Sequence, residues 1–228
     1  MNFFFHDSHD YVDPTFDFET ESNNEFRVIQ RDDKNAHEIF KEPVYDGILV
    51  SKAIVDGVNG VSGKYSEGQR QRFFREKIYN FFRLPKEYLT MGDCGAFSYA
   101  NEYEPIYTVD EVNEFYDNVG FTFGISLDHI IFDFETPNKL VEGERLNECK
   151  RRQNITLEKA EEFLLKNKNY HFEPYGVAHG WNPESYADSV FKLQNMGYNR
   201  IALGGLVPLK SHEILKILVK VNTIRRYN

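Results

Sequence analysis

The chain has 228 residues, of which 41% are apolar and 15% aromatic, and its formal net charge at pH 7 is −9. This length is sufficient for a full hydrophobic core, and the apolar content excludes a mostly disordered chain. The negative charge argues against indiscriminate nucleic-acid binding, although it leaves room for a local basic patch.

The cysteine content and the apolar profile predict the compartment. Two cysteines, Cys94 and Cys149, fit a reducing cytoplasm and no disulfide framework. The first residues lack the features of a signal peptide, and no window reaches membrane-spanning length. We therefore expect a soluble, cytoplasmic protein without a membrane partner.

The first fifth of the chain combines short apolar runs with polar loops. Residues 2–5 are a brief strand candidate, and the next loop holds four side chains of metal-binding type: His6, Asp7, His9 and Asp10. They lack the spacing of known zinc motifs, so we expect a polar loop and no metal site. Residues 17–42 are acidic and rich in asparagine, which predicts a surface excursion rather than a separate domain. Residues 45–53 are the next strand candidate.

Two basic clusters are candidates for binding nucleic acid. Residues 66–84 predict an amphipathic helix that ends before Pro85, and a second predicted helix covers residues 151–166. The cations in question are Arg70, Arg72, Arg75, Arg151 and Arg152. They form solvated helix faces in the simpler interpretation. If they instead meet phosphates, binding will fall steeply with salt.

Residues 89–99 predict a short strand that runs into a glycine-containing turn. Gly92 and Gly95 would let the backbone approach a ligand closely. Asp93 lies at the carboxyl end of the strand, where a partly buried carboxylate can accept a proton or read a base. Its alternative role is to cap the turn. We expect Cys94 to be a small buried side chain rather than a nucleophile.

The middle of the chain repeats this pattern. A helix is predicted over residues 109–118, and an apolar strand begins at Phe121. Asp128 lies at the carboxyl end of this predicted strand, as Asp93 does at the end of its own. Residues 133–148 predict a variable loop before the helix over 151–166. The last predicted helix, residues 211–221, is expected to be capped by Ser211.

Residues 175–209 predict one strand-helix-strand unit. A short apolar strand ends at Ala178, Asn182 caps a helix with Pro183 at its first position, and Gly197 ends that helix in a left-handed conformation. The next strand covers residues 201–203. Because such crossovers are parallel, the polar turns that follow both strands should lie side by side: His179-Gly180 and Gly204-Gly205-Leu206.

Six strand candidates separated mostly by helices predict an α/β fold of the TIM (β/α)8-barrel type. About eight units and 250 residues close such a barrel. We therefore expect one barrel-like domain over residues 1–228 that is incomplete, with about six βα units and without the late ones.

Four motifs occur in one order: Asp-Cys-Gly-Ala-Phe at 93–97, Leu-Asp-His at 127–129, Gly-Val-Ala-His-Gly at 176–180 and Ala-Leu-Gly-Gly-Leu at 202–206. This set resembles the tRNA-guanine transglycosylase superfamily, most closely the DpdA-type branch that places 7-deazaguanines in DNA. The resemblance implies that a guanine is flipped out and exchanged for a 7-deazaguanine, such as 7-cyano-7-deazaguanine, through a covalent enzyme intermediate.

The resemblance also implies roles for individual residues. Asp93 matches the aspartate of base recognition and proton transfer, and Asp128 matches the one that accepts hydrogen bonds from the guanine edge. His179 stands where the family usually has glutamine, so recognition would be more sensitive to pH. The segment that contacts the seven-position substituent matches Gly204, Gly205 and Leu206.

The chain departs from the family at its end. The covalent nucleophile and the cysteine cluster for a structural zinc lie later in the family than this chain extends. We expect no cofactor in this chain, with zinc only if later residues or a partner supply its ligands. Asp133 is a conceivable substitute nucleophile, but a plain loop aspartate is the better interpretation.

Three alternatives remain open. The substrate is DNA or, alternatively, tRNA, and a partner chain could complete the barrel. The chain could also be a non-catalytic subunit that binds nucleic acid or base. A third hypothesis is an unrelated barrel enzyme for a small phosphorylated substrate, suggested by Gly204-Gly205 but opposed by Pro208, which precludes a helix start directly after the pair.

Overall fold

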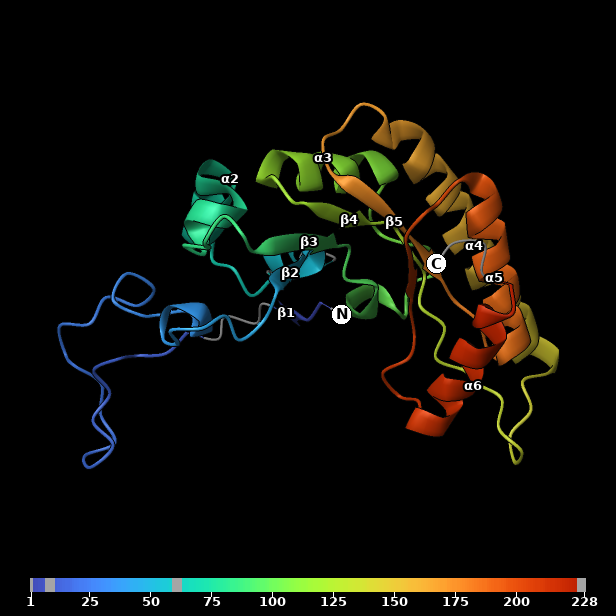
Figure 1. Ribbon diagram of the computed structural model, residues 1–228, viewed down its shortest axis with the longest axis horizontal. Coiled ribbons are helices and arrows are strands. Elements are labelled where there is room, and N and C mark those ends of the chain that lie inside the picture. The colour runs from blue at the N-terminus through green and yellow to red at the C-terminus, as the bar shows by residue number, and fades with distance from the viewer. Residues whose placement is uncertain (1, 7–10, 59–62, 225–228) are drawn as a thin grey trace.

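In the computed structural model, residues 2–6, 11–58 and 63–224 are described. Their sheet has six parallel strands, each paired with its neighbours in chain order. The strands are β1 (Phe4–His6), β2 (Gly47–Ser51), β3 (Leu89–Asp93), β4 (Phe123–Ile125), β5 (Glu173–Ala178) and β6 (Ile201–Leu203). The sheet curls without closing, as Figure 1 shows. The predicted incomplete α/β barrel with about six βα units is confirmed.

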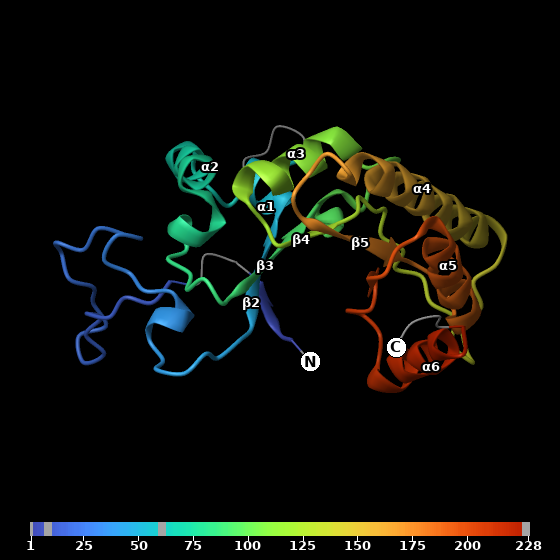
Figure 2. The same cartoon turned by 45° about the horizontal axis from the view of Figure 1, so that its top comes forward.

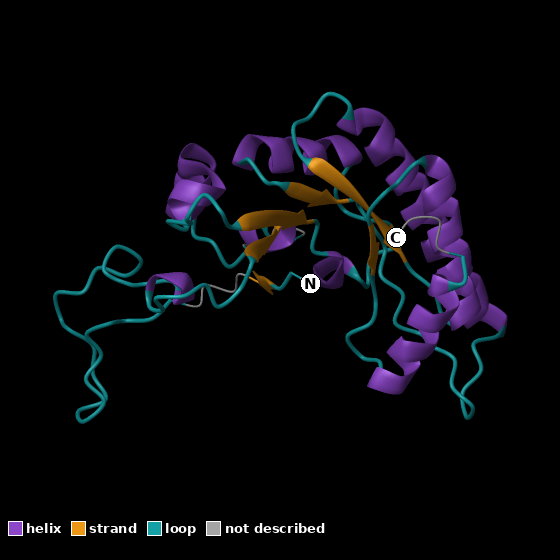
Figure 3. Cartoon of the chain, viewed as in Figure 1, coloured by secondary structure: helices purple, strands orange, loops and turns teal. Residues whose placement is uncertain are grey.

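Helices cover the convex side of this sheet. The α-helices are α1 (Lys52–Asp56), α2 (Glu67–Phe81), α3 (Val109–Val119), α4 (Gly143–Asn167), α5 (Pro183–Met196) and α6 (Ser211–Asn222), and the short 3-10 helices are η1 (Ala36–Glu38) and η2 (Ala96–Tyr99). Figures 2 and 3 show α3, α4 and α5 following one another around the outside of the strands. None of the helices in the described ranges has the length and apolar character needed to cross a membrane.

Local sequence explains the helix ends that were predicted correctly. In α5 the Asn182 side chain accepts a hydrogen bond from the Ser185 N–H, Pro183 occupies the first turn, and Gly197 ends the helix with φ of 108°. In α3 the Thr108 side chain caps the first turn and Gly120 ends the last one. These signals are short-range, so they operate whatever the rest of the chain does.

Two predicted boundaries were wrong. α4 begins at Gly143, inside the predicted loop, because its first turns pack Cys149 into a buried cluster with Ile131, Val141 and Trp181. The strand after Phe121 is extended only to Ile125. Beyond it the chain leaves the sheet, and the His129 N–H donates to Thr156 Oγ1 of α4.

α6 and α2 also differ in detail from the prediction. The N-cap of α6 is Lys210 rather than Ser211, because the Lys210 N–H donates to the Glu213 carboxylate. α2 ends at Phe81 and is interrupted at Lys77, where φ is 62°.

The largest core cluster lies between the sheet and helices α2 and α3. Tyr116 of α3 is fully buried and packs directly on the strands. A Cβ at Gly92 would lie 2.3 Å from Tyr116 Cδ1, and one at Gly124 would lie 2.6 Å from Cδ2. Gly92 therefore makes room for a core ring, and the prediction that it lets the backbone approach a ligand was wrong.

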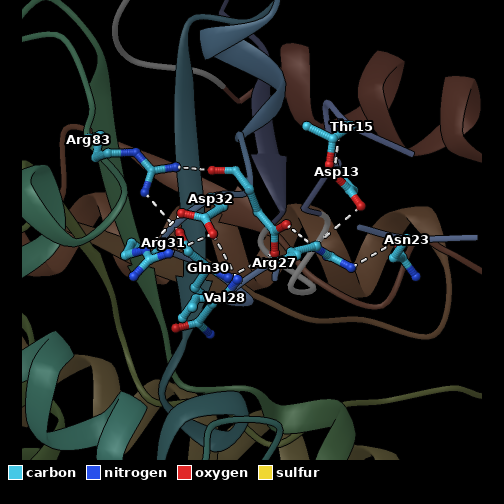
Figure 4. A network of polar contacts seen from close by, with 10 residues as sticks. Asp13, Thr15, Asn23, Arg27, Val28, Gln30, Arg31, Asp32 and Arg83 are labelled. Atoms are coloured by element: carbon cyan, nitrogen blue, oxygen red, sulfur yellow. Dashed lines mark hydrogen bonds and ion pairs between the residues drawn. The ribbon is translucent and has the colours of Figure 1, made fainter. Parts of the chain in front are cut away.

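Residues 17–42 belong to an arm that projects from the barrel and is blue in Figures 1 and 2. Arg83, just after α2, ties this arm to the barrel (Figure 4). Its guanidinium donates to the carbonyl oxygens of Gln30 at 3.2 Å and Asp33 at 2.7 Å, and pairs with Glu38 at 2.6 Å. The arm is thus held mainly by polar contacts rather than by a core of its own.

The loop after β1 cannot be compared with its prediction in full. Asp7, His9 and Asp10 lie outside the described residues. Among the residues that are described, no group of three or more His, Cys, Asp or Glu side chains is arranged to hold a metal ion.

Candidate functional site

A cavity of about 390 Å³ opens at the carboxyl edge of the sheet. Every strand contributes to it, through its last residue or through the turn that follows: His6, Ser51, Asp93, Asp128, His179 and Gly204. Ligands of parallel α/β sheets bind at this edge. The volume lies within the range of about 300–1,000 Å³ that is typical of small-molecule sites.

Asp93 is the last residue of β3 and faces this cavity. Its Oδ2 accepts a hydrogen bond from the Ser51 hydroxyl at 2.7 Å and another from the Gly95 N–H at 2.9 Å. Burial, and then the neighbouring Asp128 carboxylate, raise the pKa of Asp93 above its ordinary value. Asp93 therefore holds a proton more readily than an exposed aspartate does.

Asp128 is buried and receives hydrogen bonds on both oxygens. Oδ2 lies 2.6 Å from His179 Nε2, and Oδ1 accepts from the Cys94 thiol at 3.0 Å. The Tyr99 hydroxyl donates to Cys94 Sγ at 3.0 Å. Desolvation raises the pKa of Cys94 well above its usual value, so the residue is the buried thiol that was predicted. The Asp128 carboxylate is consequently fixed in place before any ligand binds.

His179 follows β5 and is completely buried. Its backbone oxygen accepts a 2.7 Å hydrogen bond from Gln153 Nε2 of α4, which fixes the turn. Its Nδ1 has no hydrogen-bond partner in the described part of the chain. A buried ring nitrogen without a partner is available to a ligand in the cavity.

The two glycine turns lie side by side, as predicted. A Cβ at Gly204 would lie 2.4 Å from His179 Cε1, and one at Gly205 would lie 2.7 Å from the Ile131 carbonyl oxygen. Gly205 also has a φ of 72°, which disfavours other residues. Both glycines line the cavity, whereas Leu206 packs beside it in a cluster with Phe134, Tyr186 and Ile217.

Phe97 is an exposed aromatic ring at the cavity. It lines the cavity although 76% of its surface is accessible, and its ring meets that of Phe132 edge-on at 5.8 Å. Exposed rings beside a cavity can stack on planar ligands. The sequence placed Phe97 within a family motif but indicated no role for it.

The candidate basic residues do not converge on this cavity. In α2, Arg70 pairs with Asp56 at 2.6 Å, and both Arg72 and Arg75 pair with Glu76. Only Arg75 among these three has a side chain that is mostly accessible, at 70%. Binding of nucleic acid by α2 stays a prediction.

The basic pair of α4 is bound internally. Arg151 and Arg152 share the Glu148 carboxylate at 2.7 Å each. Arg152 also donates to the carbonyl oxygens of Ala100 and Ile130, both at 2.9 Å. Arg152 therefore supports the loops at the cavity, and the part of these two arginines in nucleic-acid binding likewise stays a prediction.

Asp133 lies outside the main cavity. Its carboxylate pairs with Lys139 at 2.7 Å and lines a neighbouring smaller cavity of about 190 Å³. This position gives no support to Asp133 as a nucleophile for a ligand held between Asp93 and Asp128.

Ser51 and His6 are cavity residues that the sequence did not assign to this site. Ser51 ends β2 and pairs in register with Asp93 at the end of β3. His6 ends β1, and its Nε2 lies 3.4 Å from Ser51 Oγ. The signal that could have found both is their place at the carboxyl end of a strand, the same rule that marked Asp93.

Comparison with known proteins agrees with the sequence motifs. No family model matches the chain. The chain is 53% identical over 224 residues to a protein of Salmonella montevideo named DNA-guanine transglycosylase. The alignment covers 98% of this chain, which spans 54% of the length of that relative. The predicted resemblance to guanine transglycosylases is confirmed by this similarity.

Proposed function

We propose that this chain forms the base-binding part of a DNA-guanine transglycosylase, a pentosyltransferase that exchanges a guanine in DNA for a 7-deazaguanine such as 7-cyano-7-deazaguanine. The observation that carries the proposal is the placement of Asp93, Asp128 and His179 around one cavity. The relative named DNA-guanine transglycosylase supports DNA as the substrate. Two buried free thiols, Cys94 and Cys149, support a cytoplasmic location.

The cavity suits an extruded guanine. Guanine carries N–H donors on its Watson–Crick edge, and the Asp128 carboxylate at the cavity wall is an acceptor for them. His179 Nδ1 is a further buried polar atom that is available for the ring. Phe97 would stack on the face of the base. Gly204 and Gly205 leave room beside the ring because neither carries a side chain.

Asp93 would transfer the proton that exchange requires. When the bond from the sugar C1′ to guanine N9 breaks, the leaving base must gain a proton, and the incoming base must later lose one. A carboxyl whose pKa is raised by burial and by Asp128 keeps this proton at a higher pH than an exposed aspartate does. The carboxylate that forms the bond to C1′ we assign to a later part of a longer protein or to a partner chain that completes the barrel.

The test is the exchange of labelled guanine into duplex DNA and, separately, into tRNA. The chain is assayed alone and together with a polypeptide that supplies the later half of the Salmonella relative. We expect incorporation into DNA in the combined setting and its loss by at least 100-fold in Asp93→Asn. Asp188→Asn is the matched control, because Asp188 pairs with Lys192 on the surface of α5.

The other outcomes discriminate between the alternatives. Incorporation into tRNA alone would replace DNA with RNA as the substrate. Binding of guanine without exchange in either setting would make the chain a non-catalytic subunit. The absence of both guanine binding and exchange would contradict the proposal and would favour an unrelated barrel enzyme.

A further inference from the structure

We propose that Ser51 is a positioning residue, which holds Asp93 Oδ2 so that Oδ1 is presented to the base in the cavity. This inference rests on the proposed function, because it assigns to Asp93 the proton transfer described above. Ser51 lines the cavity, and the role proposed for it acts through its hydrogen bond to Asp93.

The hydrogen bonds at Asp93 are divided unequally between its two oxygens. Ser51 Oγ donates to Oδ2 at 2.7 Å, and the Gly95 N–H donates to the same oxygen at 2.9 Å. Among the described residues, none donates to Oδ1. Two donors stabilise negative charge on Oδ2, so a proton on this carboxyl is placed on Oδ1. The arrangement thus selects which oxygen exchanges a proton with a ligand.

The register of the sheet creates this contact. Ser51 and Asp93 are paired residues at the ends of β2 and β3, and Ser51 is buried with 5% of its surface accessible. The Gly95 N–H, two residues after Asp93, reaches Oδ2 as in an Asx turn, and Gly95 itself has a φ of 83°. A Cβ there would lie 2.6 Å from the Ala53 Cβ. The Gly95 donor is therefore part of the backbone, and the Ser51 donor is a short, buried side chain at the end of β2.

The Ser51 hydroxyl does not make the helix-capping hydrogen bond that is usual for a serine at the start of a helix. Ser51 is the N-cap of α1, yet its side chain makes no capping hydrogen bond. A serine N-cap ordinarily accepts from a backbone N–H in the first turn. Ser66, the N-cap of α2, does so with the Gln69 N–H. Ser51 instead directs its hydroxyl at Asp93, which distinguishes positioning from helix capping.

Three titratable groups adjoin this pair. Asp128 adds negative charge from the β4 side, and Cys94 follows Asp93 in the chain and donates to Asp128. His6 of β1 lies 3.4 Å from Ser51 Oγ by its Nε2. A change in the titration of Asp93 must be distinguished from the titration of these three neighbours, so the experiment should observe the Asp93 carboxyl directly.

The experiment compares Ser51→Ala with Ser51→Thr, which keeps a hydroxyl, and with Ser66→Ala as the matched loss of a serine N-cap. The pKa of Asp93 is measured by carbon NMR of ¹³C-labelled aspartate, and kcat and KM for guanine exchange are measured against pH. We expect Ser51→Ala to raise the pKa of Asp93, because a hydrogen bond to the charged form is lost. The acid limb of the pH profile of kcat should shift to higher pH together with this pKa. At the optimum, kcat should fall roughly 10- to 100-fold at similar KM.

Ser51→Thr should restore both the pKa and kcat, and Ser66→Ala should leave them unchanged. If Ser51→Ala does not fold, Ser51→Cys takes its place, since a thiol has similar size but donates weakly. An unchanged Asp93 pKa and kcat in the Ser51 variants would overturn the proposal. A wild-type chain that stays inactive together with the later half of the Salmonella relative, but whose Asp93 pKa still responds to Ser51, would refute the proposed function and leave the contact between the two residues established.

Discussion

His179 Nε2 lies 2.6 Å from Asp128 Oδ2, although the two residues are 51 positions apart. This contact joins the turn after β5 to the segment after β4 at the floor of the cavity. Both side chains are buried, and Cys94 occupies the other oxygen of Asp128. The acceptor that we assign to guanine is therefore already oriented in the free protein, which lowers the cost of binding a rigid base.

Asp128→Ala should weaken both the fold and base binding. The substitution leaves His179 Nε2 and the Cys94 thiol without their acceptor in a buried place, which costs about 1–3 kcal/mol of unfolding free energy. We also expect guanine affinity to fall at least 10-fold in titration calorimetry. Asp188→Ala, on the surface of α5, should change neither quantity appreciably. Undiminished guanine binding by Asp128→Ala would remove Asp128 from the base-reading site.

Asp93→Asn should stabilise the protein near neutral pH. The pKa of Asp93 is raised in the folded state, so the unfolded chain loses this proton first as the pH rises. Stability is then lost between the ordinary pKa of 3.8 and the raised value, and the loss persists above it. Asparagine does not ionise and escapes this loss.

Urea unfolding of both proteins across pH 3 to 8 measures this effect. The gain of Asp93→Asn over wild type should grow as the pH rises through the window just described and should vanish at its acid end. A difference that stays constant with pH would show that Asp93 titrates normally. Asp188→Asn serves again as the surface control.

Gly204→Ala should disturb the cavity by steric overlap. Its Cβ would lie 2.4 Å from Cε1 and 2.6 Å from Nε2 of His179, a ring that is itself fixed by Asp128. We expect a loss of about 1–3 kcal/mol in the free energy of unfolding and weaker guanine binding. Gly68→Ala in α2 should instead gain about 0.5–1 kcal/mol, because a Cβ there would meet no described atom within 4 Å outside its own helix backbone and chain neighbours. Equal effects at the two positions would contradict the packing described for Gly204.

Arg83→Ala should loosen the arm without unfolding the barrel. The variant loses the hydrogen bonds to the carbonyl oxygens of Gln30 and Asp33 and the ion pair with Glu38. Amide hydrogen exchange should accelerate at least 10-fold within residues 27–38 and stay unchanged in β2 to β5. Arg75→Ala, which removes a mostly exposed side chain from α2, the helix just before Arg83, is the control. Slow exchange in the arm of the Arg83 variant would mean that other contacts hold it.

Much of this architecture could be predicted because its signals are local. The cap of α5, the stop at Gly197 and the runs of apolar residues act over a few positions, and they correctly indicated the order of strands and helices. From that order alone, the rule that parallel strands gather their turns at one edge brought Gly204 next to His179.

The sequence by itself thus determined the incomplete barrel, the motif resemblance and the candidates Asp93, Asp128 and His179. Only the tertiary structure decided that α4 starts at Gly143 and that Gly92 serves a core ring. It alone also directed the hydroxyl of Ser51 to Asp93. These features depend on contacts between residues dozens of positions apart. No local pattern carries such information, because packing decides which of several available partners a side chain finally meets.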